Sequence, residues 1–145
     1  MHKVTNLNRY EMKLIEDYIK NIDRLRMRLK IRRWEIMDNP VEDNPGAGKS
    51  NLPGDPIHRE ITMYLTDDYY MNMDKIINSI ENVYNRSDDD VKRIFDLKYW
   101  EPELGLETWE EIAKHLHYSK TNILRVRERY LKEIAERIDF INSDF

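Results

Sequence analysis

An all-α fold with a helix-turn-helix in its C-terminal part is the architecture that this sequence predicts. Apolar residues recur at spacings of three and four rather than in alternation, which is the pattern of amphipathic helices. Helix-capping residues stand ahead of several of these stretches. Hydrophobic residues make up 40% of the 145 and cysteine is absent, as expected of a folded intracellular protein that uses neither disulfides nor thiolate metal sites.

The first long helix is predicted over residues 8–37. Its apolar stripe consists of Ile15, Tyr18, Ile22, Leu25, Leu29 and Ile36. Arg32 takes the next position of this stripe and limits how far coiled-coil packing continues. The pattern fits either a helical hairpin within one chain or a coiled-coil homodimer, and we expect Trp34 to pack. The run from Arg24 to Arg33 holds six basic residues and no acid, which suits either a solvated face or contact with phosphate.

A polar loop rich in proline and glycine follows at residues 38–54. It contains GAGKS, at residues 46–50, which resembles the end of a phosphate-binding loop. The complete motif needs a glycine where this chain has Asp43, and a strand rather than a helix before it. Nucleotide binding is therefore not expected.

Two further helices are predicted before the C-terminal motif. Asp55 and Pro56 suit the N-cap and the first residue of a helix that continues to Tyr84. Residues 87–90 then offer a capping box for a helix that ends near Tyr99.

Residues 108–134 predict the helix-turn-helix itself. Thr108 and Glu111 have the spacing of a capping box, which marks the start of the first helix. The inward face of this helix consists of Trp109, Ile112, Ala113 and Leu116. A two-residue turn begins at His117, and Ser119 caps the second helix.

The second helix has one apolar face and one basic face. Its inward stripe consists of Ile123, Val126, Tyr130, Ile134 and Ile138. Its outward face consists of Lys120, Thr121, Leu124, Arg125, Glu128 and Lys132, with Asn122, Arg127 and Arg129 at the margins. Such an arrangement lets one face meet phosphate, while the net charge of −4 opposes non-specific binding to nucleic acid.

Three stretches of residues 91–134 carry a family resemblance: IFDLKYW at 94–100, TWEEIAKHL at 108–116, and the long Arg-rich helix that Ser119 opens. They are similar to the promoter-binding fourth region of sigma factors and to the related phage regulators of the RinA and ArpU type. The resemblance implies that the last helix enters the major groove while the preceding helix supports it across the DNA backbone. One departure is His117, where such proteins usually have glycine; His117 must accept a positive backbone angle or reshape the turn.

We expect a sequence-specific DNA-binding transcription regulator, and the resemblance implies a phage late-gene activator in the bacterial cytoplasm. Asparagine pairs with adenine and arginine with guanine, so the expected base-reading side chains are Lys120, Thr121, Asn122 and Arg125. Those expected to contact phosphate are Ser119, Arg127, Arg129 and Lys132. The implied partners are double-stranded DNA and RNA polymerase or a sigma factor. Residues 1–86 would form a helical assembly region, and residues 87–145 the DNA-binding region.

Other functions stay open on the sequence alone. A small terminase subunit, which packages phage DNA, also joins a helix-turn-helix to helical oligomerisation segments. A protein-interaction module would instead use the Arg-rich helix to contact an acidic surface of a sigma factor or polymerase. The plainest alternative is an ordinary helix pair with a solvated basic face.

Catalysis, cofactors and metals have no support in the sequence. His115 and His117 lie two apart, so a helix sends them to different faces, and Glu111 with His115 lacks a third ligand. No serine, histidine and acid have the spacing of a catalytic triad. No stretch approaches the roughly 20 apolar residues that span a bilayer. We therefore expect a protein that is not an enzyme and has no membrane segment.

Overall fold

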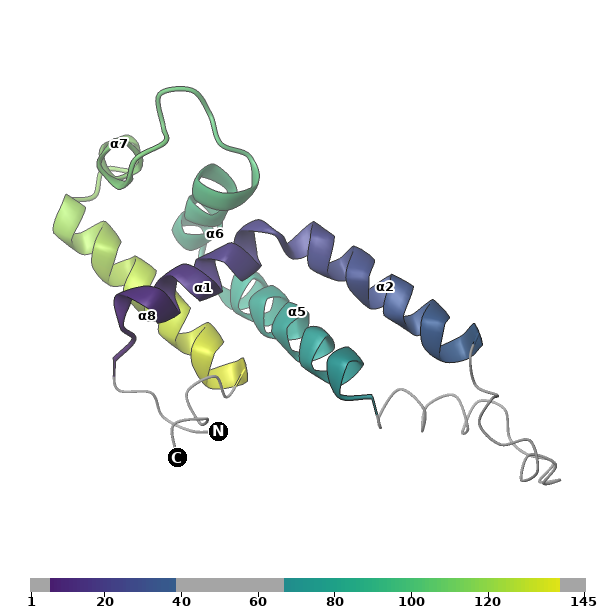
Figure 1. Ribbon diagram of the computed structural model, residues 1–145. Helices are drawn as coiled ribbons and strands as arrows, with labels where there is room; N and C mark the ends of the chain where they lie inside the picture. The colour runs from purple at the N-terminus through teal and green to yellow at the C-terminus, as the bar shows by residue number, and fades with distance from the viewer. Residues whose placement is uncertain (1–5, 39–66, 139–145) are drawn as a thin grey trace, which may run out of the picture. The chain divides into compact units, whose positions relative to one another are not determined.

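The computed structural model describes residues 6–38 and 67–138 of the chain (Figure 1). All regular secondary structure within these ranges is helical, which confirms the predicted all-α class. The elements are α1 (Arg9–Lys20), α2 (Ile22–Asp38), α5 (Asp68–Arg86), α6 (Asp89–Phe95), the π-helix η1 (Asp96–Trp100), α7 (Trp109–His115) and α8 (Lys120–Ile138). The predicted loop after Asp38, with its GAGKS stretch, and the predicted helix start at Asp55 lie outside the described residues.

The chain divides into two compact units. Unit 1 comprises residues 1–22 and 78–145, and unit 2 comprises residues 23–77. This division differs from the predicted regions 1–86 and 87–145, because α1 packs against α8 and η1 in unit 1. Figure 1 shows α1 crossing α8. The last helix, α8, thus packs together with a segment from the beginning of the chain.

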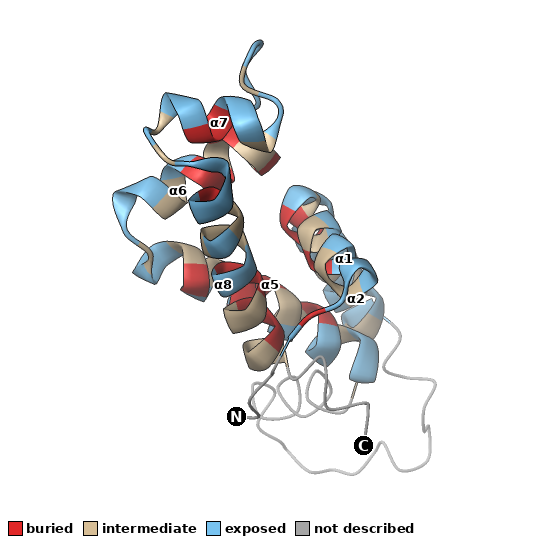
Figure 2. Cartoon of the chain, turned by 90° about the vertical axis from the view of Figure 1, so that its left-hand side faces the viewer, coloured by how far each residue is buried: buried red, intermediate tan, exposed pale blue. Residues whose placement is uncertain are grey.

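The core of unit 1 takes side chains from α1, from the C-terminal part of α5 and from all the later helices. Its largest fully buried members are Ile15, Ile19, Ile80, Val83, Ile94, Phe95, Leu97, Ile112, Ile123, Leu131 and Ile134. Aromatic rings of η1 and α8 meet that of Phe95, which lies 5.6 Å from Tyr99 and 4.7 Å from Tyr130 between ring centroids. In Figure 2 the buried residues of α7 lie along one side of the helix, with exposed residues on the other.

The predicted single helix over residues 8–37 is wrong, because Asn21 interrupts it. The Asn21 side chain and backbone N–H both donate to the Asp17 carbonyl, at 2.8 and 3.0 Å. The Asn21 backbone leaves the helical region at φ −101° and ψ 25°. Asparagine competes in this way for the carbonyls that a continuing helix would use. Ile19, which the predicted stripe omits, is fully buried.

The cap of α6 is Asp88, so the capping box predicted at residues 87–90 is also wrong. The Asp88 carboxylate accepts the Val91 amide at 3.0 Å. The Ser87 hydroxyl instead donates to the Val83 carbonyl in the preceding helix, a common alternative for a short hydroxyl side chain. The wider turn of η1 then extends α6 to Trp100, close to the predicted end.

Unit 2 contains α2 from Asp23 onward and the first part of α5. Among its described residues, the buried side chains are those of Leu25, Met73 and Ile77. Trp34, which was expected to pack, is 56% exposed, so this expectation is wrong. The reason is geometric: helical spacing places Trp34 on the side of α2 opposite Leu25.

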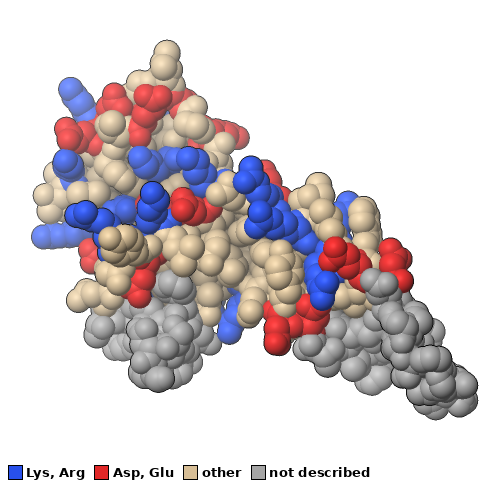
Figure 3. All heavy atoms as spheres, in the orientation of Figure 1, with Lys and Arg blue, Asp and Glu red and all other residues tan. Residues whose placement is uncertain are grey.

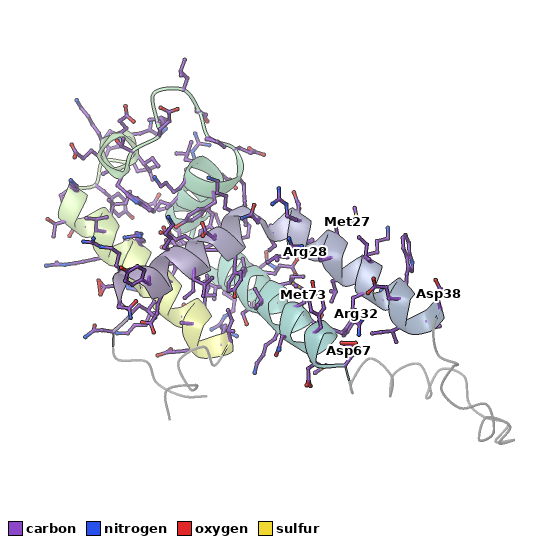
Figure 4. The ribbon with its side chains drawn as sticks, viewed as in Figure 1. Met27, Arg28, Arg32, Asp38, Asp67 and Met73 are labelled. Atoms are coloured by element: carbon purple, nitrogen blue, oxygen red, sulfur yellow. The ribbon has the colours of Figure 1, made fainter. Side chains whose placement is uncertain are left out.

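Arg32 links α2 to the start of α5. Its Nε donates to Asp67 Oδ2 at 2.8 Å, and the two side chains point toward one another in Figure 4. This hydrogen bond is the main reason why the pKa of Asp67 lies below its ordinary value. Asp67 in turn caps α5 by accepting the Tyr70 amide at 3.1 Å. The predicted continuous helix from Asp55 to Tyr84 is therefore wrong, because a new helix begins after Asp67.

Candidate nucleic-acid interface

The first helix of the motif, α7, begins at the predicted capping box. Thr108 Oγ1 accepts the Glu111 amide at 3.1 Å, and Glu111 Oε1 accepts the Thr108 amide at 2.9 Å. The same carboxylate oxygen also accepts the Glu107 amide at 3.0 Å. These backbone donors lower the pKa of Glu111, the Thr108 amide most of all. The box satisfies amides that the first turn of a helix otherwise leaves unpaired.

The turn after α7 is a Schellman motif with histidine in the left-handed position. The Tyr118 amide donates to the Ala113 carbonyl at 2.7 Å, and the His117 amide donates to the Lys114 carbonyl at 3.2 Å. His117 has a φ of 64°, so of the two outcomes that the sequence left open, a positive backbone angle or a reshaped turn, it adopts the first. Most helices that end this way place glycine there, because a Cβ is strained in this conformation.

Tyr118 anchors the turn to the rest of unit 1. Its hydroxyl donates to Asp90 Oδ2 in the first turn of α6 at 2.8 Å. That hydrogen bond to a carboxylate is the main cause that raises the pKa of Tyr118. Because the turn is fixed from within by its own backbone and from outside by Tyr118, the start of α8 has a defined position relative to α6 and α7.

The second helix, α8, begins at the predicted cap. Ser119 Oγ accepts the Asn122 amide at 3.0 Å, and the first turn that follows contains no acid. The first turn itself thus places no negative charge at the positive end of the helix dipole, as suits an approach to phosphate.

The inner face of α8 is close to the predicted stripe. Ile123, Tyr130 and Ile134 are buried, and Val126 and Ile138 are partly buried. The prediction missed two fully buried residues, Leu131 and Ala135, and Leu124, predicted to face outward, is partly buried. The apolar face is broader than the stripe because α1 covers it as well as α7.

Most of the predicted contact residues lie at the surface together. Within the first three turns of α8 and its cap, the exposed ones are Ser119, Lys120, Thr121, Asn122, Arg125 and Arg129. Lys132, one turn further, is partly buried. Figure 3 shows lysine and arginine side chains gathered over the N-terminal half of α8, at the left edge of the view, with acidic side chains over α7 above them.

Lys120 lies at the border between these two groups of charges. Its Nζ is 2.9 Å from Glu110 Oε1 of α7, and the two side chains are 57% and 70% exposed. A pair with this exposure contributes little to stability. Lys120 can therefore exchange Glu110 for another anion at small cost.

Arg127 lies apart from the exposed set. Its Nη2 and Nε bind the two carboxylate oxygens of Glu16, at 2.6 and 2.9 Å, and its side chain is only 23% exposed. The guanidinium also lies 5.5 Å from the centroid of the Trp109 ring. The hydrogen bond to Glu16 is the main cause that raises the pKa of Arg127. Arg127 thus connects α8 to α1 and α7.

Two tyrosines are linked by hydrogen bonds to the Glu16–Arg127 pair and form a polar cluster with it. The Tyr99 hydroxyl donates to Glu16 Oε2 and shares a hydrogen bond of 2.6 Å with the Tyr130 hydroxyl. Burial raises the pKa of both tyrosines well above the ordinary value, so both stay neutral. Sequence reasoning missed Glu16, because nothing in the local pattern joins two residues that are 111 positions apart.

The comparison with protein families places residues 7–136 in DUF722, described as a protein of unknown function, and the chain belongs to this family. The matched range runs from α1 into α8, so it includes both Glu16 and Arg127. No curated protein and no solved structure gave a significant match.

Within residues 6–38 and 67–138, no three histidine, aspartate or glutamate side chains are grouped as metal ligands. Over the same residues, every helix is too short or too polar to cross a membrane.

Proposed function

We propose that this protein is a sequence-specific DNA-binding transcription regulator that inserts the N-terminal half of α8 into the major groove. One observation carries the proposal. The first turns of α8 expose a contiguous polar and basic surface, while the opposite face is buried against α7 and α1. A helix of 19 residues is about 28 Å long, so its exposed end can enter the groove while its other end stays in the protein.

The proposed base-reading side chains are Lys120, Thr121, Asn122 and Arg125. They occupy the exposed first two turns of α8, as recognition helices require. Ser119, Arg129 and Lys132 are proposed to contact phosphate and set the register. Arg127 is assigned a different role from the one that the sequence suggested: its pairing with Glu16 makes it a positioning residue that orients α8.

The assignment to transcription, and to phage late-gene activation in particular, rests on the resemblance to the fourth region of sigma factors and to the RinA and ArpU regulators. The Schellman turn at His117 supports this part of the proposal, because it closes the short connection between α7 and α8 without the usual glycine.

Selection of bound sites from a random duplex pool by the full-length protein tests the proposal. We expect an enriched sequence motif, and binding to random duplex that weakens steeply with salt. Arg125→Ala should relax the selected motif at one base position, whereas Lys13→Ala, the same charge change on the exposed surface of α1, should leave the motif intact. No binding to any duplex at low salt would overturn the proposal, and a ring of many subunits by light scattering would favour the terminase alternative.

A further inference from the structure

Glu110 of α7 is joined by an ion pair to the start of the proposed recognition helix. Its Oε1 accepts from Lys120 Nζ at 2.9 Å. Lys120 is the first residue of α8, and the N-terminal residues of a recognition helix are those that contact base edges. If α8 enters the groove as proposed, a base that the Lys120 ammonium binds therefore lies beside the Glu110 carboxylate as well.

Lys120 has enough hydrogen-bond donors to bind Glu110 and a base together. A lysine ammonium has three donors, and Glu110 takes one of them. Lysine contacts guanine through O6 and N7, which takes the other two. Both of these acceptors are neutral, so they do not compete for the ammonium as a phosphate anion would. The ion pair is thus kept when Lys120 binds guanine.

Glu110 brings an acceptor to the same place. Its side chain is 70% exposed and binds Lys120 through Oε1, so Oε2 is open to a donor. Phosphate repels a carboxylate, whereas the N4 amino group of cytosine is a major-groove donor that glutamate accepts from. Of the neighbouring acids, Glu107 is exposed and Glu111 has its carboxylate occupied by the capping box. Lys114, one turn from Glu110 on the same face of α7, is an exposed cation that offsets repulsion from nearby phosphates.

A G·C base pair offers the complement of this ion pair. Guanine O6 and cytosine N4 are hydrogen-bonded to one another at about 2.9 Å, the separation that Lys120 Nζ and Glu110 Oε1 also have. An acceptor and a donor of the base pair thus face the donor and an acceptor of the ion pair. An A·T pair suits it less, because thymine offers Lys120 only O4, beside a methyl group. On the basis of the proposed function, we propose that Lys120 and Glu110 together read one G·C base pair, with Lys120 on guanine and Glu110 on cytosine.

Selection of bound sites from a random duplex pool by full-length Glu110→Ala and Lys120→Met tests whether the two residues act on one base pair. We expect both variants to lose about tenfold of the preference for G·C at the same position of the motif and to keep the preferences at the other positions. Glu107→Ala removes an exposed acid just before the cap of α7 and should leave the motif unchanged. Urea unfolding of each variant establishes that it is folded.

Base analogues in the selected site assign the contacts to atoms. With 2-pyrimidinone in place of the cytosine, the N4 amino group is absent. The parent protein should then bind about tenfold more weakly than to the unmodified site, whereas the affinity of Glu110→Ala should not change. With 7-deazaguanine in place of the guanine, N7 is absent, so the parent and Glu110→Ala should both bind more weakly, whereas Lys120→Met should not. Fluorescence anisotropy measures these affinities.

Three results would overturn the assignment. The first is a motif that Glu110→Ala leaves unchanged, which would make the ion pair a surface contact only. The second is tighter binding of Glu110→Ala to all sequences with the same motif, which would mean that Glu110 only competes with phosphate for Lys120. The third is a loss of preference at different positions in Glu110→Ala and Lys120→Met. A parent protein that selects no motif would overturn the proposed function and this assignment with it, whereas each of the three results overturns the Glu110 assignment alone.

Discussion

Glu16 of α1 holds Arg127 of α8 through both of its carboxylate oxygens, with N–O distances of 2.6 and 2.9 Å. The two side chains are 17% and 23% exposed, so the pair is largely withdrawn from water. It joins a helix near the start of the chain to the middle of the proposed recognition helix. Because a two-point contact fixes a guanidinium in direction as well as distance, this pair helps to set the orientation of α8.

Removal of the charge on Glu16 should destabilise unit 1. We expect Glu16→Gln to lower the free energy of unfolding by about 2 to 3 kcal/mol, because it leaves the Arg127 guanidinium without its counter-charge. Urea unfolding measures the change. Asp17→Asn makes the corresponding change from acid to amide at the exposed neighbour on α1. Its free energy of unfolding should stay within about 0.5 kcal/mol of that of the parent protein.

A double-mutant cycle makes this prediction specific to the pair. Arg127→Met alone should be destabilising, and adding it to Glu16→Gln should cost less than the sum of the two single effects. Additive effects would mean that the two residues act independently, contrary to the geometry.

Glycine at position 117 should stabilise the turn. His117 has a φ of 64°, a conformation that costs a residue with a Cβ about 1 kcal/mol or more. His117→Gly removes that cost but gains disorder in the unfolded chain, so we expect a net gain of about 0.5 kcal/mol and unchanged DNA binding. His115→Gly, at the last residue of α7, should instead destabilise by up to about 1 kcal/mol. Thermal unfolding of both variants measures these changes in stability. A loss of stability in His117→Gly would contradict the strain argument.

Ser119 permits a test that separates folding from DNA binding. Aspartate and asparagine cap helices as well as serine does, so Ser119→Asp and Ser119→Asn should both keep the free energy of unfolding within about 0.5 kcal/mol. Aspartate also adds a negative charge at the end of α8 that is proposed to approach phosphate. We expect Ser119→Asp to bind duplex at least about tenfold more weakly and Ser119→Asn to bind nearly as the parent does, by fluorescence anisotropy. Equal affinities of the two variants would remove the start of α8 from the interface.

Base-reading and phosphate-contacting residues should differ in specificity. Arg125→Ala should cost about 1 to 3 kcal/mol on the selected site and relax the preference at one base position. Lys132→Ala should weaken binding to all sequences to a similar degree. Titrations of both variants against the selected site and against scrambled duplex measure the difference. Small and equal effects would exclude the proposed placement of α8 in the groove.

The start of α5 should loosen in acid. The Arg32 guanidinium holds the pKa of Asp67 below the 3.8 of a free side chain. A carboxyl group with a lowered folded-state pKa stabilises the fold above its unfolded pKa, at about pH 4 and higher, and this contribution disappears as the pH falls through the lowered value. The Tyr70 amide donates to the Asp67 carboxylate, and the Met71 amide donates to the Asp67 backbone carbonyl. The hydrogen-exchange protection of both amides should therefore decrease over that pH range. Asp67→Asn should remove this pH dependence; its persistence in that variant would assign the effect to another group.

Sequence by itself determined the local features of this protein. The Thr108 cap, the turn at His117, the Ser119 cap and most of the inner stripe of α8 all depend on contacts within four or five residues, for which spacing and side-chain chemistry suffice. His117 is the clearest case. Its place in a two-residue turn between two capped helices marked it as the residue that must accept a positive backbone angle or reshape the turn, and its φ of 64° shows the first outcome.

Tertiary structure alone decided which arginine is held and which is exposed. Arg125 and Arg127 look alike in the sequence, yet Glu16 withdraws only Arg127 from the surface. It also decided that α1 belongs with α8, and that Trp34 lies at the surface although its residue type suits a core. These outcomes depend on contacts between distant segments and on which side of a helix is covered by a neighbouring helix. Helical periodicity assigns a residue to one face of a helix. It does not say what that face contacts.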